Sequence, residues 1–315
     1  MRRQLLLTLC FLLFSNADAQ TIVTRREISI STQTVPIQFS ERGHIFLPVR
    51  VNNSEPLWFV LDSGSSSTLL NERLVKKLNL KVEGVGEASG AGAGADEGLL
   101  TSGVSFNLSG IRLTNQQIPA IDFKRLETSM GRDIDGLLGY DFMRRFVFEV
   151  DYEASVVKIH SAATYRYKGR GEILPITTED GHPHVRLKFT LPEREPLEGK
   201  FIVDGGAGGA TMEFASPFAQ AHRLLDTVQL QENISLPGIG GGVKISRGRG
   251  KSIQLGRLVL ENPIVGFPQA NKGAFANRKI AGLIGAKLLR RFTVIYDDRR
   301  RRIIFEPNSS FAQPE

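Results

Sequence analysis

The feature that most constrains this chain of 315 residues is an internal repeat. Five short landmarks occur twice in the same order, and the spacing between the two copies grows only from 138 to 146 residues. Small insertions produce such a drift, whereas chance does not preserve the order of five landmarks. The pairs are Val35-Pro36-Ile37 with Leu174-Pro175-Ile176, Gly43-His44 with Gly181-His182, Asp62 with Asp204, Ile134–Gly139 with Ile280–Gly285, and Met143–Asp151 with Leu289–Asp297. The sequence therefore predicts two copies of one folding unit.

Each copy is about 140 residues long, which is enough to bury a core of its own. Most segments are short apolar or alternating runs separated by turn residues, which is typical of strands. Apolar residues follow a helical spacing over 68–80 and are expected to do so again over 215–225. The pattern predicts a mostly-β protein with one short helix in each copy. We place the boundary between the copies in the linker at 164–171, giving units 20–168 and 169–315.

The first 19 residues have the features of a secretory signal peptide. Arg2 and Arg3 precede an apolar run over 5–14, and Ala17-Asp18-Ala19 provides a cleavage site. The run is shorter than the ~18 residues that a membrane anchor needs. We expect an exported protein, periplasmic or secreted, with no stable membrane anchor after cleavage. Cys10, the one cysteine of the chain, would leave with the signal, so no disulfide is expected.

The formal net charge is +7, and the densest basic cluster is Arg299–Arg302. The matching segment of the first copy, Asp151–Ser155, has the composition of a hairpin turn. No aromatic residues are interleaved with the arginines, as they are in channels for single-stranded nucleic acid. The cluster is predicted to be a solvated turn, and nucleic acid is not expected as a partner.

In both copies an apolar run delivers an aspartate into a loop of small residues. The first reads Phe59-Val60-Leu61-Asp62-Ser63-Gly64-Ser65, and the second reads Phe201-Ile202-Val203-Asp204-Gly205-Gly206-Ala207. A buried strand that ends in such a loop predicts a carboxylate held by the backbone and by hydroxyl groups. Two aspartates a few ångströms apart would share one proton. The ionised one can then activate water while the protonated one donates a hydrogen bond, so neither a metal nor a cofactor is required.

Each aspartate loop is followed by an apolar-apolar-Gly turn, Leu137-Leu138-Gly139 and Leu283-Ile284-Gly285. This combination resembles the aspartic peptidase superfamily, with two pepsin-like or retropepsin-like units in one chain, and more narrowly bacterial exported proteins of the aspartyl protease family. The resemblance covers roughly residues 35–307. It implies a two-lobed acid protease fold with closed-barrel-like lobes, and an aspartic endopeptidase acting on peptides or proteins. Asp62 and Asp204 would be the catalytic dyad, supported by Ser63, Gly64, Ser65, Gly205 and Gly206.

The second loop departs from the family pattern at Gly205. In the family, a Thr or Ser hydroxyl from each loop bonds across to the other loop; Ser63 can supply its side and Gly205 cannot. Losing one side of such a buried network costs about 1–3 kcal/mol. A non-catalytic peptide-binding protein with a degenerate second site therefore stays open as an alternative, as does a purely structural envelope protein. We also expect Asp62 to be the more acidic aspartate, because Ser65 offers it a donor that Asp204 lacks.

Two Gly-rich segments, 84–98 and 238–242, fall where the family places its flaps. Gly-rich backbone suits a lid that bends and brings N–H groups close to a peptide. A floppy surface loop is the alternative for the first segment. The candidate substrate contacts are Gly90, Gly92, Gly94, Gly240 and Gly241. With both aspartates in one chain, a monomer is expected.

His182-Pro183-His184 is half of a conceivable zinc site. The other three histidines are scattered, and no cysteine would remain after signal cleavage. No metal is therefore expected.

Overall fold

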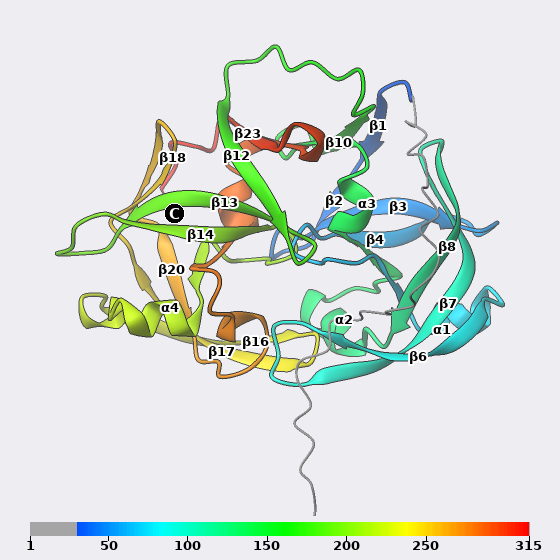
Figure 1. Ribbon diagram of the computed structural model, residues 1–315, viewed down its shortest axis with the longest axis horizontal. Helices are drawn as coiled ribbons and strands as arrows, with labels where there is room; N and C mark the ends of the chain where they lie inside the picture. The colour runs from blue at the N-terminus through cyan, green and yellow to red at the C-terminus, as the bar shows by residue number, and fades with distance from the viewer. Residues whose placement is uncertain (1–29, 315) are drawn as a thin grey trace, which may run out of the picture.

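The computed structural model describes residues 30–314, which form a mostly-β protein (Figure 1). The fold class predicted from the sequence is confirmed. The predicted signal peptide, 1–19, lies outside the described residues. Among the helices of residues 30–314, none has the length and apolar character needed to cross a membrane. We call residues 30–168 the first half and residues 169–314 the second half.

The first half is built on a ring of paired strands. Its strands are β2 (Gln38–Phe39), β3 (Ile45–Val51), β4 (Leu57–Leu61), β5 (Leu69–Asn71), β6 (Lys81–Ser89), β7 (Ala95–Leu108), β8 (Ile111–Ile121) and β9 (Gly136–Leu138). The ring runs β3-β4-β9-β5-β8-β7, and β7 returns to pair with β3. Strands β4 and β9 are parallel, as are β5 and β8. The closed order matches the barrel-like unit that the sequence predicts.

The second half repeats this pairing pattern. Its strands are β12 (Glu172–Glu179), β13 (His182–Thr190), β14 (Leu197–Asp204), β15 (Met212–Phe214), β16 (Leu230–Gly238), β17 (Gly241–Arg249), β18 (Ser252–Leu255), β19 (Leu258–Glu261), β20 (Ile264–Pro268) and β21 (Gly282–Gly285). The order is β13-β14-β21-β15-β20-β17, with β14 parallel to β21 and β15 parallel to β20. Here β18 pairs back to β13. Duplication as the origin of this repeat stays a prediction.

A further set of strands joins the two halves. These strands are β1 (Gln33–Pro36), β10 (Val147–Asp151), β11 (Val156–His160), β22 (Phe292–Asp297) and β23 (Arg302–Pro307). They pair in the order β1-β11-β10-β22-β23-β12, and the antiparallel β10–β22 pair links the first half directly to the second. We call this set the joining sheet. The domain boundary between residues 168 and 169 remains a prediction.

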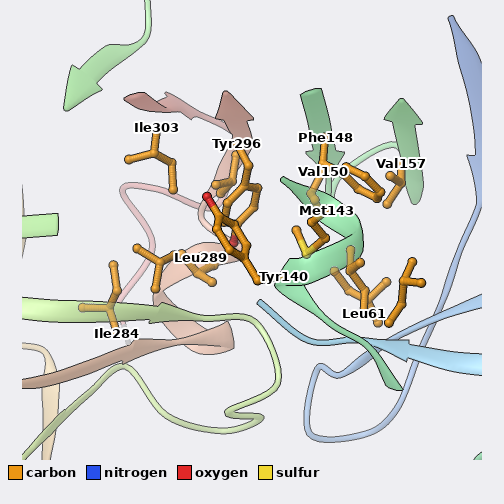
Figure 2. Close-up of a cluster of buried hydrophobic side chains, with 14 of the residues drawn as sticks. Leu61, Tyr140, Met143, Phe148, Val150, Val157, Ile284, Leu289, Tyr296 and Ile303 are labelled. Atoms are coloured by element: carbon orange, nitrogen blue, oxygen red, sulfur yellow. The ribbon is translucent and has the colours of Figure 1, made fainter. Parts of the chain in front are cut away.

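One apolar cluster extends through both halves beneath the joining sheet (Figure 2). Side chains of the first half meet those of the second half, with two tyrosine rings between them. The residues seen there include Leu61, Met143 and Phe148, then Ile284, Leu289 and Ile303, and the tyrosines Tyr140 and Tyr296. The strands that end in the two aspartates therefore rest on a shared core.

The helices are short. They are α1 (Arg73–Lys77), α2 (Lys124–Met130), α3 (Tyr140–Met143), α4 (Ser216–Ala221) and α5 (Ala286–Leu289), with 3-10 turns η1 (Leu224–Asp226), η2 (Ala274–Ala276) and η3 (Asp298–Arg300). The helix predicted over 68–80 is wrong for its first part, which is strand β5. Leu69 and Leu70 pair with β9, and Leu70 also pairs with β8, so sheet pairing overrides the helical spacing. The helix predicted over 215–225 is observed as α4 followed by η1.

The basic cluster lies at the turn between β22 and β23, as predicted. It is only partly solvated, because Arg300 and Arg302 bond the carboxylate of Asp297, which is fully buried. A buried carboxylate with two guanidinium partners is charge-compensated. These two arginines therefore stabilise the turn.

Candidate active site

Asp62 stands at the end of β4, where the chain leaves the ring. Its backbone N–H donates to the carbonyl of Leu138 in the parallel strand β9, at 3.0 Å. One carboxylate oxygen, Oδ1, accepts the N–H of Gly64 at 2.9 Å, and the Asp62 carbonyl accepts the N–H of Ser65 at 3.2 Å. We call residues 62–68 the first aspartate loop. Backbone N–H groups of this loop hold the carboxylate in place.

Asp204 occupies the same place at the end of β14, beside Gly285 of the parallel strand β21. Its Oδ1 accepts the N–H of Ala207 at 2.9 Å. The N–H of Ala286 donates to the Ala207 carbonyl at 3.1 Å, which ties the loop to α5. We call residues 204–211 the second aspartate loop. Backbone donors again hold the carboxylate.

The two carboxyl groups face each other across the boundary between the halves. A Cβ atom added to Gly64 would lie 2.1 Å from Cγ of Asp204, and one added to Gly206 would lie 2.3 Å from Cγ of Asp62. Each carboxyl group is therefore packed against the glycine of the opposite loop. Only glycine leaves room for this approach. The two aspartates, 142 residues apart in sequence, thus form a single site.

Burial raises the pKa of both carboxyl groups. The pKa of Asp62 is raised to about 6, although N–H groups of Gly64 and Ser65 oppose the shift. Burial and the nearby charge of Asp62 raise the pKa of Asp204 well above its usual range. Asp62 therefore ionises first and Asp204 keeps the proton. This is the order of acidity expected from the sequence.

The reason expected for that order is wrong. The hydroxyl of Ser65 donates to the carbonyl of Ser67 at 2.7 Å, a local bond that closes the turn. It is the backbone N–H of Ser65 that lowers the pKa of Asp62. Ser65 supports the first aspartate loop through its main chain. Burial raises both pKa values, and the asymmetry comes from the pair itself: the charge of Asp62 raises the pKa of Asp204, whereas a hydrogen bond with Asp204 lowers that of Asp62.

The hydroxyl of Ser63 bridges the two aspartate loops. It donates to the carbonyl of Val203 at 2.8 Å and accepts the N–H of Gly205 at 2.9 Å. Ser63 is almost fully buried, at 1% exposure. Gly205 offers no hydroxyl in return, so the bridge is one-sided, as the sequence predicts.

The two Gly-rich segments are hairpins whose tips meet. Strands β6 and β7 form one hairpin, and β16 and β17 form the other. The N–H of Gly92 donates to the carbonyl of Ile239 at 2.9 Å, and that of Gly94 donates to the carbonyl of Gly240 at 2.8 Å. Gly90 packs against Ile239, and Gly241 takes a φ of +122° in the second tip. The hairpin for the first segment replaces the alternative of a floppy loop.

Residues 47–142 match the family model described as aspartyl protease. This stretch of the first half is therefore similar to an aspartyl protease domain. The match includes the first aspartate loop and β9, and it ends before the second half begins.

Two curated proteins are similar to the chain, both called DNA damage-inducible protein 1. The protein of Saccharomyces cerevisiae is 29% identical over 128 residues, which is 39% of this chain and 27% of that protein. The protein of Candida glabrata is 28% identical over 161 residues, which is 49% of this chain and 35% of that protein. The chain thus matches about a third of the length of these relatives.

Asp96, at the start of β7, links the two hairpin tips. Its Oδ2 accepts the N–H of Gly240 at 3.0 Å, and its Oδ1 accepts a guanidinium N–H of Arg125 at 3.1 Å. Arg125, from α2, also donates to the carbonyl of Gly238 at 3.4 Å. A carboxylate and a guanidinium of the first half thus hold the backbone of the second hairpin.

Each aspartate loop is also packed by a turn of the opposite half. The buried ring of His44 lies on Gly208, where an added Cβ would come within 2.3 Å of Cε1 and Nε2. The hydroxyl of Ser40 bonds Nδ1 of His44 at 2.8 Å, and burial lowers the pKa of His44 to about 4, so the ring is neutral. On the other side Gly181 lies against Ser66, 2.6 Å from an added Cβ. These two turns hold the aspartate loops of the two halves together.

Three residues of the site were missed in the sequence. Asp96 stands inside a Gly-rich segment, His44 belongs to a repeated landmark, and Tyr296 contacts the hydroxyl of Ser63. Comparing the two copies position by position would have singled out Tyr296, because the first copy has Val150 there. His182 and His184 lie on β13 with ring centroids 6.5 Å apart, and residues 30–314 contain no group of three or more potential metal ligands.

Proposed function

We propose that this chain is an aspartic endopeptidase in which Asp62 and Asp204 activate one water molecule. The observation that carries the proposal is the packing of each carboxyl group on the glycine of the opposite loop. This arrangement supplies two adjacent carboxyl groups of unequal pKa, which is what the acid–base activation of one water molecule requires. The family match of residues 47–142 supports protease function in general.

The chemistry follows from the two protonation states. Ionised Asp62 takes a proton from water while the water oxygen bonds to the carbonyl carbon of the peptide. Protonated Asp204 donates to the carbonyl oxygen, on which negative charge develops. The tetrahedral intermediate then collapses, the C–N bond breaks, and the nitrogen leaves as an amine after it has taken up a proton from the pair. An extended peptide would lie between the aspartates and the hairpin tips, pairing through its backbone.

We further propose that the protein works as a monomer after export. The two aspartates come from one chain, so no second copy is needed to complete the pair. A mature N-terminus at Gln20 would support signal cleavage, and a specific activity independent of protein concentration would support the monomer. An uncleaved N-terminus in the exported fraction would contradict the first expectation.

The test is digestion of a peptide library by the mature chain from about pH 3 to about pH 8, beside Asp62→Asn and Asp204→Asn. We expect both substitutions to lower kcat by roughly 10³-fold or more, because each carboxyl group has a separate role. Cleavage that survives Asp204→Asn would overturn the shared dyad. A folded protein that cleaves nothing but still binds peptides would favour the non-catalytic binding module, for which Gly205 is the observation.

A further inference from the structure

The bridge between the aspartate loops has a third partner besides the two backbone groups of the second loop. The phenol oxygen of Tyr296 lies 3.3 Å from the hydroxyl oxygen of Ser63. Tyr296 is on β22, 233 residues further along the chain, and is 3% exposed. Figure 2 shows its ring within the shared core, beside Tyr140. The side chain therefore reaches the bridge from the core.

Counting donors assigns the direction of this contact. The single hydroxyl hydrogen of Ser63 is used on the carbonyl of Val203, at 2.8 Å. A serine oxygen has two acceptor positions, and the N–H of Gly205 takes one of them. Tyr296 must then donate to the other. The separation is longer than the ~2.8 Å usual for such bonds, so we expect a moderate effect.

The internal repeat shows that this polar contact belongs to one side of the site only. Where the second copy has Tyr296, the first copy has Val150; where the first copy has Ser63, the second has Gly205. Ser63 of the first copy therefore meets Tyr296 of the second copy. The equivalent pair on the other side of the site would be Gly205 and Val150, which offer no side-chain hydroxyl. The two differences match each other, as a cooperating pair requires.

We propose that Tyr296 is a positioning residue that fixes the hydroxyl of Ser63, so that one bridge keeps both aspartates in register. This inference rests on the proposed peptidase function. A serine hydroxyl free to rotate could leave either backbone partner; a third bond from a buried phenol restricts it to the bridging rotamer. Tyr296 thereby compensates for the hydroxyl that residue 205 lacks.

The second aspartate loop has room for the missing hydroxyl. A Cβ added to Gly205 would lie 3.4 Å from the hydroxyl oxygen of Ser63 and 3.7 Å from the carbonyl of Leu61, which are ordinary contact distances. It would lie 4.0 Å from the N–H nitrogen of Ser63. These backbone groups mirror the two that Ser63 itself bonds. Gly205→Ser can therefore complete a reciprocal bridge.

The experiment compares kcat and KM of Tyr296→Phe with those of Tyr140→Phe. Tyr140 is a matched control, since its buried ring lies in the same core and its hydroxyl bonds Asp298 rather than Ser63. We expect Tyr296→Phe to lower kcat about fivefold with KM within about twofold, and Tyr140→Phe to leave both within about twofold. Adding Gly205→Ser to Tyr296→Phe should restore most of the lost kcat.

Equal kinetics of the two Tyr→Phe variants would overturn the inference, and so would a Gly205→Ser effect that is the same with and without Tyr296. If the unsubstituted protein cleaves no peptide, the proposed peptidase function is wrong, but the contact between Tyr296 and Ser63 can still be tested by measuring the unfolding equilibrium. In that case a cycle of Ser63→Ala and Tyr296→Phe should show a coupling of about threefold in the unfolding constant. Additive effects in the cycle would overturn the inference.

Discussion

The two aspartate loops have the same backbone and different side chains. Both follow a strand that is parallel to a second short strand, and in both a backbone N–H bonds the carboxylate at 2.9 Å. In the first loop the hydroxyl of Ser63 reaches across, whereas in the second loop Gly205 contributes only its backbone N–H, which donates to that hydroxyl. The main chain therefore positions each carboxylate, and the hydroxyl of Ser63 is the side-chain link between the two loops.

Both loops have a glycine packed against the opposite carboxyl group, so substitutions at these two glycines should have similar effects on catalysis. Gly64→Ala and Gly206→Ala each place a methyl group within 2.3 Å or less of the opposing carboxyl carbon, so one loop must move. We expect each variant to lose roughly 10³-fold in kcat/KM, as loss of dyad geometry would cause. Steady-state cleavage beside far-UV circular dichroism measures the effect. Gly84→Ala is the control, because an added Cβ there meets nothing within 4 Å.

The unequal acidity of the two aspartates gives a sharper comparison. Burial raises both pKa values in the folded protein, so the folded state retains protons that the unfolded state releases above pH ~4. This contribution favours folding at low pH and is lost as pH rises through the folded pKa, about 6 for Asp62. Asp204→Asn should therefore raise the free energy of unfolding at pH ~8 and flatten its pH dependence.

Urea unfolding across this pH range measures the effect, with Asp62→Asn as the matched variant. The gain should be larger for Asp204→Asn, because its pKa is the higher of the two. Equal gains would contradict the order of acidity. In the active protein, cleavage should fall as pH drops through about 6, since Asp62 is then protonated and cannot act as a base.

Ser63→Ala tests the difference between the loops directly. It leaves the carbonyl of Val203 and the N–H of Gly205 without their shared partner, and both groups lie in a buried place. We expect the free energy of unfolding to fall by about 2 kcal/mol. Gly205→Ala should cost less than 1 kcal/mol, since its new methyl group meets only ordinary contacts. If denaturant titrations show that Ser63→Ala and Gly205→Ala lower the free energy of unfolding equally, Ser63 does not act as the bridge between the loops.

The smallest effect is expected at the hairpin tips. Asp96→Ala removes the acceptor for the N–H of Gly240 and the partner of Arg125. The contact between the two hairpin tips should weaken. We expect KM to rise about threefold, with kcat within about twofold. Hydrogen exchange of the Gly240 amide should become faster, which is a readout independent of cleavage. Glu97→Ala, on the same strand and exposed, is the control; an equal effect there would exclude a specific latch.

Much of the architecture could be predicted because its signals are local or repeated. Alternating apolar residues predict strands such as β3 and β13, and the repeat predicts that both halves share one pairing order. The helix over 68–80 failed because Leu69 and Leu70 fit a helical spacing equally well and are drawn into the ring. Local sequence contains no information that separates these outcomes.

The sequence predicts which residues form the site better than it predicts the contacts that these residues make. Asp62 and Asp204 follow from two similar loops, and the structure brings them together. The bond that Ser65 makes to Ser67, and the contact of Tyr296 with Ser63, depend on rotamers and on how distant strands are stacked. Such contacts emerge only when the whole core is assembled.

The joining sheet links the two halves of the molecule by hydrogen bonds as well as through the chain itself. Strands β10 and β22 pair along four residues, and β12 of the second half begins just after the linker at 164–171. Once the chain has folded, we therefore expect the halves to stay associated even if the linker is cut. A protease that nicks the linker should yield two fragments that migrate as one particle and melt in one transition, because separating them would expose the edges of both strands.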